Sequence, residues 1–329
     1  MSPSPAPAGS VPAGEPVVAT RGLTKSYGRL TAVSELDVDV PPGVTGLVGA
    51  NGAGKSTLVR MLLGLLPATA GSARVLGLDV ATEGPAIRRR VGYMPEHDPL
   101  PPDVTATEFV VHMARMSGLP HAAARERAAD TLRHVGLFEA RYRAIGGYST
   151  GMRQRVRLAQ AIVHDPDLVL LDEPTNGLDP AGRDEMLTLV RRIGADFGIS
   201  VVVTSHLLGE LERISDHVVV IDGGRLVRST ATADAMGLGA VLAVEVTGDA
   251  AGADAAAAAL AGAGLRTVRR GRVVEVDLAG ETDSGAACDA VRDQVAGLGL
   301  GLVRLERRRH RLSEMFTSPV PAERVEVGA

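Results

Sequence analysis

The fold of this chain is indicated by one stretch of sequence, Gly49-Ala50-Asn51-Gly52-Ala53-Gly54-Lys55-Ser56. It follows the apolar run Val44–Val48 and opens the segment Ser56–Leu66, which we expect to be a helix ended by Pro67. Glycines let a backbone curl and point several N–H groups inward, and a helix N-terminus adds partial positive charge. Lys55 supplies a full charge for phosphates, and the Ser56 hydroxyl can ligate Mg²⁺. The stretch, continued by Thr57, therefore predicts a phosphate-binding loop.

Two acids stand at the end of another apolar run. Leu168–Leu171 has the length and composition of a buried strand, and Asp172 and Glu173 follow it directly. Such a strand would deliver Asp172 to a metal ion, directly or through water. Glu173 would then face the terminal phosphate, where a carboxylate can polarise an attacking water. Combined with the phosphate-binding loop, the pair indicates hydrolysis of a nucleoside triphosphate by a P-loop ATPase.

Strand-length apolar runs and helical segments alternate over the first two thirds of the chain. Ser200–Thr204 and His217–Ile221 resemble the runs already named, and strands this apolar are typical of a parallel sheet covered on both faces. Strand patterns are missing between about residues 104 and 164, where Ala122–Val135 is the clearest helix. We therefore expect an α/β domain with a helical insertion.

The chain changes character near residue 235. We expect a disordered tail over 1–16, a nucleotide-binding domain over 17–234 and an accessory domain over 235–329. The last of these has the order strand, helix, strand, strand, helix, strand, which is typical of a small α+β domain of ferredoxin-like type. Its expected elements are Val241–Val246, Ala251–Gly262, Thr267–Val268, Val273–Leu278, Ala286–Ala296 and Leu302–Leu305.

Composition excludes several classes of function. The 329 residues carry a net charge of -4 and only 2% aromatic residues, so we expect no nucleic-acid partner. The single cysteine, Cys288, allows no internal disulfide and fits a reducing compartment. No segment reaches the roughly 18 consecutive apolar residues that a membrane-spanning helix needs. We therefore expect a cytoplasmic protein that contacts a membrane only through a partner.

Further motifs resemble those of one family of P-loop ATPases. Tyr148–Arg155 is similar to the signature motif of ABC transporter ATPases, usually Leu-Ser-Gly-Gly-Gln, and Asn176–Asp179 is similar to their D-loop. His206 is placed like the family's switch histidine, and Tyr27 like the aromatic residue that stacks on adenine. The motifs occur in the family's order and cover about residues 17–227.

The resemblance implies a mechanism and partners. Two nucleotide-binding domains pair head to tail, each ATP and its Mg²⁺ lying between the phosphate loop of one and the signature of the other. Ser149, Gly151 and Asp179 would then belong to the nucleotide site across the interface, and His206 would hold the γ-phosphate and the attacking water. Because one chain carries both halves, a homodimer would serve. The remaining partner would be a separate transmembrane permease at the inner face of the cell membrane.

Three residues depart from the family pattern. Glu96 stands where the family has a glutamine that contacts Mg²⁺, and a carboxylate oxygen can still ligate that ion. Thr150 and Met152 replace Gly and Gln of the signature, while Ser149 and Gly151 are kept. The substitutions resemble the stand-alone ATPases of drug, antibiotic and polysaccharide exporters of the daunorubicin type. The C-terminal segments Leu305–Arg307 and Leu312–Phe316 resemble the ending of that branch.

The sequence also bears on alternatives to an ATP-hydrolysing exporter subunit. A non-transport ABC ATPase acting on ribosomes or DNA would usually carry two nucleotide domains or a long coiled coil, and this chain shows one phosphate loop and no basic surplus. A regulatory module with a degenerate site is disfavoured by the intact Lys55, Asp172 and Glu173. Guanine is disfavoured because no Asn-Lys-x-Asp motif is present.

Overall fold

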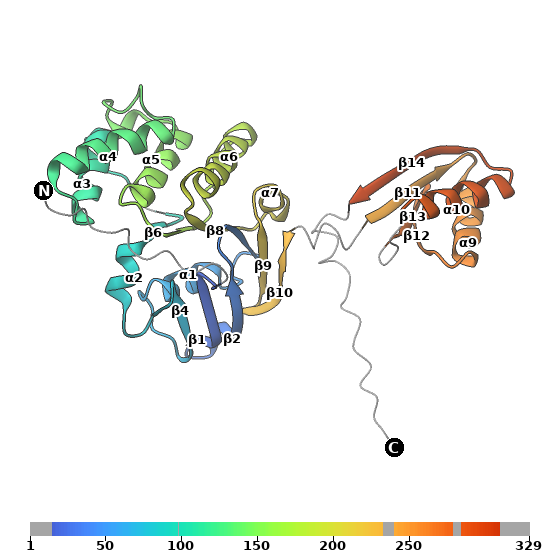
Figure 1. Cartoon of the computed structure of the whole chain (residues 1–329), viewed down its shortest axis with the longest axis horizontal. Coiled ribbons are helices and arrows are strands. Elements are labelled where there is room, and N and C mark those ends of the chain that lie inside the picture. The colour runs from blue at the N-terminus through green and yellow to red at the C-terminus, as the bar shows by residue number, and fades with distance from the viewer. Residues whose placement is uncertain (1–14, 98, 233–239, 279–283, 310–329) are drawn as a thin grey trace, which may run out of the picture. The chain divides into compact units, whose positions relative to one another are not determined.

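The computed structural model describes residues 15–97, 99–232, 240–278 and 284–309. The chain forms two compact units, one ending at Ala231 and one beginning at Thr232 (Figure 1). The expected tail lies outside the described residues except for its last two positions, and so does the expected motif Leu312–Phe316. Within the described ranges, no helix combines the length and the apolar character that crossing a bilayer requires.

A six-stranded sheet forms the centre of the first unit. Its strands, in spatial order, are β10 (Arg225–Ala231), β9 (His217–Asp222), β3 (Val44–Val48), β8 (Ser200–Ser205), β7 (Leu168–Leu171) and β6 (Val91–Met94). The five strands from β9 to β6 pair in parallel, and β10 is antiparallel to β9. Every residue of β3, β7 and β8 is buried. The prediction of a parallel sheet covered on both faces is confirmed.

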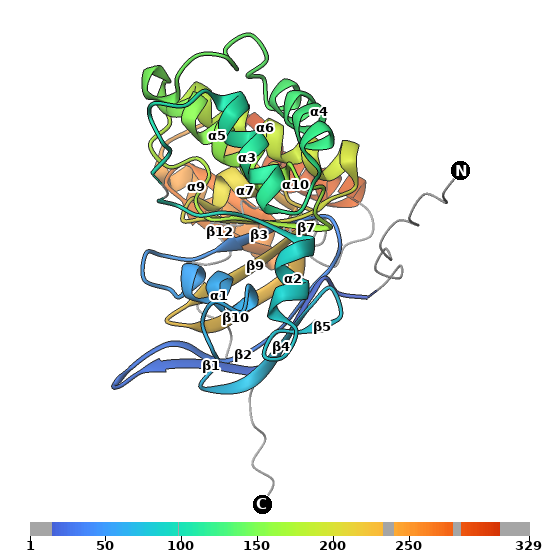
Figure 2. The ribbon, with the colours of Figure 1, turned by 90° about the vertical axis from the view of Figure 1, so that its left-hand side faces the viewer.

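A second, antiparallel sheet packs on the same core. It contains β2 (Leu30–Val40), β1 (Val18–Tyr27), β4 (Ala70–Val75) and β5 (Leu78–Asp79), followed by α2 (Gly84–Arg90). Helix α1 (Lys55–Leu62) lies between the two sheets, as Figure 2 shows. Its buried Leu58, Val59 and Leu62 belong to one core cluster with Val18 and Val38 on one side and Leu47, Val202 and Val219 on the other. This packing fixes the phosphate loop, which is the start of α1, against both sheets.

Helix α1 is shorter than expected, because it ends at Leu62 rather than Leu66. Gly64 adopts a left-handed conformation with φ of 64°. The Gly64 N–H donates to the Met61 carbonyl and the Leu65 N–H donates to the Arg60 carbonyl, which is the hydrogen-bond pattern of a Schellman cap. The prediction that Pro67 ends the helix was therefore wrong, because the helix is capped at Gly64.

The helical insertion contains α3 (Ala106–Met116), α4 (His121–His134), a short 3-10 turn (Ile145–Gly147) and α5 (Thr150–Ile162). These helices lie together beside the six-stranded sheet (Figure 1). Thr105 begins α3 with a capping box, in which its hydroxyl accepts from the Glu108 N–H while Glu108 accepts from the Thr105 N–H. Two further helices, α6 (Pro180–Phe197) and α7 (Leu208–Glu212), flank β8. The prediction of a helix over Ala122–Val135 agrees with α4 to within one residue.

The second unit follows the order β11 (Ala240–Val246), α9 (Ala250–Gly262), β12 (Arg266–Arg270), β13 (Val273–Asp277), α10 (Ser284–Gly297) and β14 (Leu302–Arg309). Its strands form one sheet in the order β12-β13-β11-β14, with each neighbouring pair antiparallel. Alternate strand residues such as Val244, Val274 and Val276 are buried with Leu260 of α9 and Val291 of α10. Both helices therefore pack on one face of the sheet.

Candidate nucleotide site

The phosphate loop connects β3 to α1 and depends on its glycines. Gly52 and Gly54 have φ angles of 85° and 99°, a region that favours glycine. A Cβ atom at Gly54 would lie 2.3 Å from the Ala32 carbonyl oxygen, and one at Gly49 would lie 2.5 Å from the Ile221 carbonyl oxygen. The glycines thus permit both the turn and the close packing of the loop against its neighbours. Within the loop, the buried Ala53 donates its N–H to the Ala50 carbonyl at 3.0 Å.

Lys55 is held at the centre of this loop. Its Nζ donates to the Gly49 carbonyl at 2.7 Å and lies 3.2 Å from Glu173 Oε1. Both side chains are almost fully buried, at 6% and 7% exposure. A buried ammonium and carboxylate at this distance attract each other much more strongly than a surface pair does. The two predicted residues are therefore brought together although 118 positions separate 55 from 173 in the sequence.

Asp172 is oriented by Thr204, at the end of the neighbouring strand β8. The Thr204 hydroxyl donates to Asp172 Oδ1 at 2.8 Å and accepts from the Glu173 N–H at 2.9 Å. Thr204 has no exposed surface, and Asp172 is 2% exposed. A buried carboxylate held by a buried hydroxyl keeps one orientation. Thr204 was not among the predicted site residues, although its place at the end of the strand beside β7 could have indicated it.

His206 reaches the same carboxylate as Lys55. Its Nδ1 lies 2.9 Å from Glu173 Oε2, so Glu173 contacts Lys55 with one oxygen and His206 with the other. Glu173 also has a φ angle of 51°, which is unusual for a residue that bears a Cβ atom. Such conformations cluster at functional sites, where the surrounding structure holds them in place.

A cavity of about 410 Å³ brings most of the predicted site residues together. It is lined by Tyr27, Ala50, Asn51, Gly52, Gly54, Lys55, Ser56, Thr57, Glu96 and Glu173, together with Leu30 and Ala32. Tyr27 is 49% exposed, and Lys25 Nζ lies over its ring at 5.3 Å from the ring centroid. The cavity therefore joins an aromatic rim to the phosphate loop.

The oxygen atoms around this cavity fit a magnesium ion. The Ser56 hydroxyl and the Glu96 carboxylate line it, and the buried Asp172 lies next to Glu173 in the chain. Oxygen ligands of this kind suit a hard cation. No cluster of three His, Cys, Asp or Glu side chains that could hold a metal alone occurs among the described residues. Mg²⁺ usually takes only one or two carboxylates from a protein together with phosphate oxygens, so this set of side chains is compatible with that ion.

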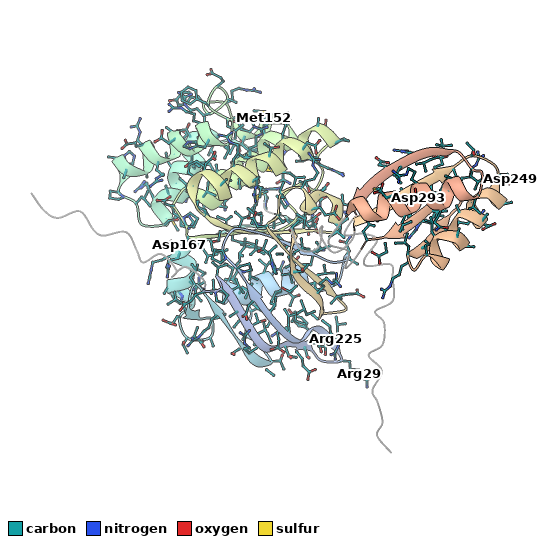
Figure 3. The ribbon with its side chains drawn as sticks, turned by 45° about the vertical axis from the view of Figure 1, so that its right-hand side comes forward. Arg29, Met152, Asp167, Arg225, Asp249 and Asp293 are labelled. Carbon is teal, nitrogen blue, oxygen red and sulfur yellow. The ribbon has the colours of Figure 1, made fainter. Side chains whose placement is uncertain are left out.

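The signature residues line a different cavity. Ser149, Thr150, Gly151, Met152 and Asp179 border a space of about 860 Å³ that shares no lining residue with the phosphate cavity. Ser149 is the N-cap of α5 and accepts from the Met152 N–H, and Asp179 is the N-cap of α6 and accepts from the Gly182 N–H. Figure 3 marks Met152 at the start of α5. The structure thus separates the two halves of the predicted site within one chain.

The first residue of the signature motif, Tyr148, is buried and fixes the start of that motif. The Tyr148 hydroxyl donates to the Ala140 carbonyl at 2.6 Å, and burial raises the pKa of this phenol. The Arg153 guanidinium donates to the Tyr148 carbonyl at 2.6 Å. These contacts hold the N-terminus of α5 in place beside its cavity.

The fold and the cavity around Lys55 and Glu173 are those of a P-loop nucleotide-hydrolysing protein. Residues 33–176 match the family model described as ABC transporter. The chain is 43% identical over 218 residues to the daunorubicin/doxorubicin resistance ATP-binding protein DrrA of Streptomyces peucetius, covering 66% of each chain. It is 37% identical over 211 residues to the bacitracin transport ATP-binding protein BcrA of Bacillus licheniformis, covering 64% of this chain and 68% of that protein.

The chain also resembles a solved structure. CbiO1 from Clostridium perfringens, described as part of the ABC transporter complex cbiONQ, matches with a TM-score of 0.61 and 24% identity. The match covers 67% of this chain and 90% of that one, and it supports the fold. The chain belongs to the ABC transporter family, as one of its ATP-binding proteins, and it is similar to members of the drug and antibiotic exporter type. The matched part spans about two thirds of these curated relatives.

Proposed function

We propose that this chain is the ATP-hydrolysing subunit of an exporter and drives a separate transmembrane permease at the inner face of the cell membrane. The observation that carries the proposal is the placement of Lys55 and Glu173, 3.2 Å apart, in the cavity of the phosphate loop. Export is supported by the names of the relatives, which include daunorubicin resistance, bacitracin transport and Nod factor export ATP-binding proteins.

The polar residues in and around the phosphate cavity have proposed roles. Tyr27 stacks on adenine, and the loop amides together with Lys55 hold the β- and γ-phosphates. Ser56, Glu96 and Asp172 would hold Mg²⁺, which when bound neutralises charge on the phosphates. Glu173 accepts a proton from the attacking water, and His206 orients Glu173 and the γ-phosphate. Because Lys55 and Glu173 attract each other, a triphosphate that draws Lys55 toward itself frees Glu173 to act as a base.

Two copies of the chain are needed to complete one site. Ser149 and Gly151 lie at the N-terminus of α5, where backbone N–H groups attract anions, yet they border a separate cavity. We propose that a second copy places its α5 N-terminus and its Asp179 over the nucleotide held by the first. Loss of the γ-phosphate then removes the charge that both copies bind, and the pair opens.

The second unit is proposed as an accessory domain of ferredoxin-like type. Its order of strands and helices supports this proposal. The sheet order β12-β13-β11-β14 supports it too, because the central strands β11 and β13 are the first and third strands of the unit along the chain. We propose that the nucleotide-binding domain covers 17–234, with its helical part over about 104–164, and that the accessory domain covers 235–329.

Phosphate release from ATP tests the proposal. The full chain should hydrolyse ATP in the presence of Mg²⁺, and faster than it hydrolyses GTP. Glu173→Gln should reduce turnover by about a hundredfold or more, because the general base is lost while the side-chain shape is kept. ATP-bound dimers of this variant should accumulate in size-exclusion chromatography. Turnover at the parental rate in Glu173→Gln would contradict the proposed role.

Membrane recruitment separates export from the alternative. Pull-down of the tagged chain from its own cells should recover an integral membrane protein. Recovery of ribosomes or DNA at physiological salt, with no membrane protein, would instead support the non-transport ATPase.

A further inference from the structure

Asn176 lies where three parts of the nucleotide-binding unit meet. Its side-chain Nδ2 donates to Glu96 Oε1 at 2.9 Å. Its carbonyl accepts from Gln154 Nε2 at 3.1 Å, and its N–H donates to the Glu173 carbonyl at 3.1 Å. One residue thus contacts the loop after β6, the signature helix α5 and the turn that holds Glu173.

The contact with α5 is firmly held. Gln154 is only 3% exposed, and its Oε1 accepts from Arg157 Nη1 at 3.0 Å while its Nε2 donates to Asn176. An amide with both ends bonded in a buried place keeps one orientation. The backbone of Asn176 is therefore tied to the helix whose first residues follow Ser149.

The contact with Glu96 suits the residue types on both sides. A carboxylate only accepts hydrogen bonds, and the amide nitrogen of Asn176 only donates. The Glu96 side chain is 34% exposed, so without a partner it would sample several rotamers. His97 Nδ1 approaches the same Oε1 at 3.7 Å but is itself 85% exposed, which leaves Asn176 as the shorter and better ordered contact.

We propose that Asn176 is the positioning residue that holds the Glu96 carboxylate toward a metal–nucleotide complex, and that it links this carboxylate to α5. The inference rests on the proposed function, because it requires a metal-bearing nucleotide in the phosphate cavity. It predicts that the donor at position 176 and the acceptor at position 96 act as a pair.

A double-mutant cycle tests the pair. Mn²⁺ is titrated into the full chain with ADP present, and free Mn²⁺ is measured by electron paramagnetic resonance. Asn176→Ala removes the donor without adding charge, so Mn²⁺ affinity should fall about threefold to tenfold. In the double variant Glu96→Gln with Asn176→Ala, the carboxylate that Asn176 holds is already absent. This variant should bind Mn²⁺ as tightly as Glu96→Gln alone.

One control keeps the outcome clear. Binding of a fluorescent ATP analogue without metal should stay at the parental affinity in Asn176→Ala. Parental Mn²⁺ affinity in Asn176→Ala overturns the inference, and so does a double variant in which the losses of Asn176→Ala and Glu96→Gln simply add. If the parent chain binds Mn²⁺–ADP and the variants give either of these contrary results, the inference fails and the proposed function stands. If the parent chain neither binds Mn²⁺–ADP nor releases phosphate, the inference and the proposed function both fail.

Discussion

The Thr204 hydroxyl bridges the two acids of the site, since it donates to the Asp172 carboxylate and accepts from the Glu173 backbone N–H. The orientation of Asp172, the proposed metal ligand, and that of Glu173, the proposed catalytic acid, therefore depend on one side chain of the adjacent strand. Parallel pairing of β7 with β8 brings this about, because the C-terminal ends of both strands meet at the same edge of the sheet.

Thr204→Val tests this bridge. Valine has a similar shape but no hydroxyl, so a buried carboxylate and a buried N–H both lose a partner. The free energy of unfolding should fall by about 1–3 kcal/mol, measured by urea denaturation. ATP turnover should fall as well, because Asp172 loses its fixed orientation. Thr188→Val, on the exposed face of α6, is the control and should change stability by less than about 0.5 kcal/mol.

Lys55→Ala should abolish ATP hydrolysis because the variant loses its affinity for ATP. It removes the charge that holds the phosphates and leaves the buried Glu173 with His206 as its remaining ionic contact. Affinity for a fluorescent ATP analogue should fall at least about tenfold, as expected for loss of a charged phosphate contact, and phosphate release should reach background. Arg60→Ala removes one positive charge from the exposed face of the same helix and should leave both measurements unchanged. Parental affinity in Lys55→Ala would contradict the role of the loop.

A mixture of two inactive variants should recover activity if the site is shared between copies. Ser149→Asp keeps a good N-cap for α5 but sets a negative charge against the γ-phosphate. Mixed with Lys55→Ala, it yields dimers in which one of the two sites has both halves intact. Phosphate release from the mixture should exceed that of either variant alone. Mixing Lys55→Ala with a chain that carries both substitutions should recover nothing, and equal rates in the two mixtures would count against a shared site.

Gly92→Ala should destabilise the first unit. A Cβ atom at this position in β6 would lie 2.0 Å from the Ala161 carbonyl oxygen, so the strand and α5 must move apart. Overpacking of this kind costs about 1–3 kcal/mol, which thermal unfolding can measure. Gly209→Ala in α7, where a Cβ atom meets nothing within 4 Å, should leave stability unchanged or raise it slightly. Equal melting temperatures for the two variants would show that β6 and α5 can move apart at little cost in free energy.

Stability should fall as the solution becomes acidic, in part because of His164. Burial lowers the pKa of this imidazole, against smaller opposing effects of the Val91 backbone and Asp165. The folded chain therefore binds the proton less readily than the unfolded chain, whose imidazole has a pKa of about 6.5. The stabilising contribution is complete above that value and is lost as the pH falls below it. Urea denaturation between about pH 7.5 and 5.5 should show a shallower decline in His164→Gln than in the parent; parallel declines would disprove this origin.

Much of the fold follows from patterns in the sequence. The buried strands β3, β7, β8 and β9 were recognised because they are continuously apolar, and α4 because its apolar residues recur at helical spacing. The antiparallel sheet of β1, β2, β4 and β5 was not predicted strand by strand. Its strands alternate buried and exposed residues with several register shifts, for example between Thr20 and Leu23, so the pattern is interrupted.

Apart from Leu30 and Ala32, the residues of the phosphate cavity were also predictable, since each belongs to a motif. Thr204 and the link from Asn176 to Glu96 were not, because they depend on which strand ends and loops meet in space. The separation of Ser149 from Lys55 into two cavities likewise comes from the distance between folded elements, which the motifs do not contain.

The left-handed backbone of Glu173 has a consequence for protein engineering. With φ at 51°, the backbone at this position would suit glycine, which would relieve about 1–3 kcal/mol of strain. The same glycine would delete the carboxylate beside the buried Lys55, and breaking a buried ion pair costs about 3–5 kcal/mol. A screen for heat resistance should therefore retain Glu173, so that thermal stability and ATP turnover are selected together at this position.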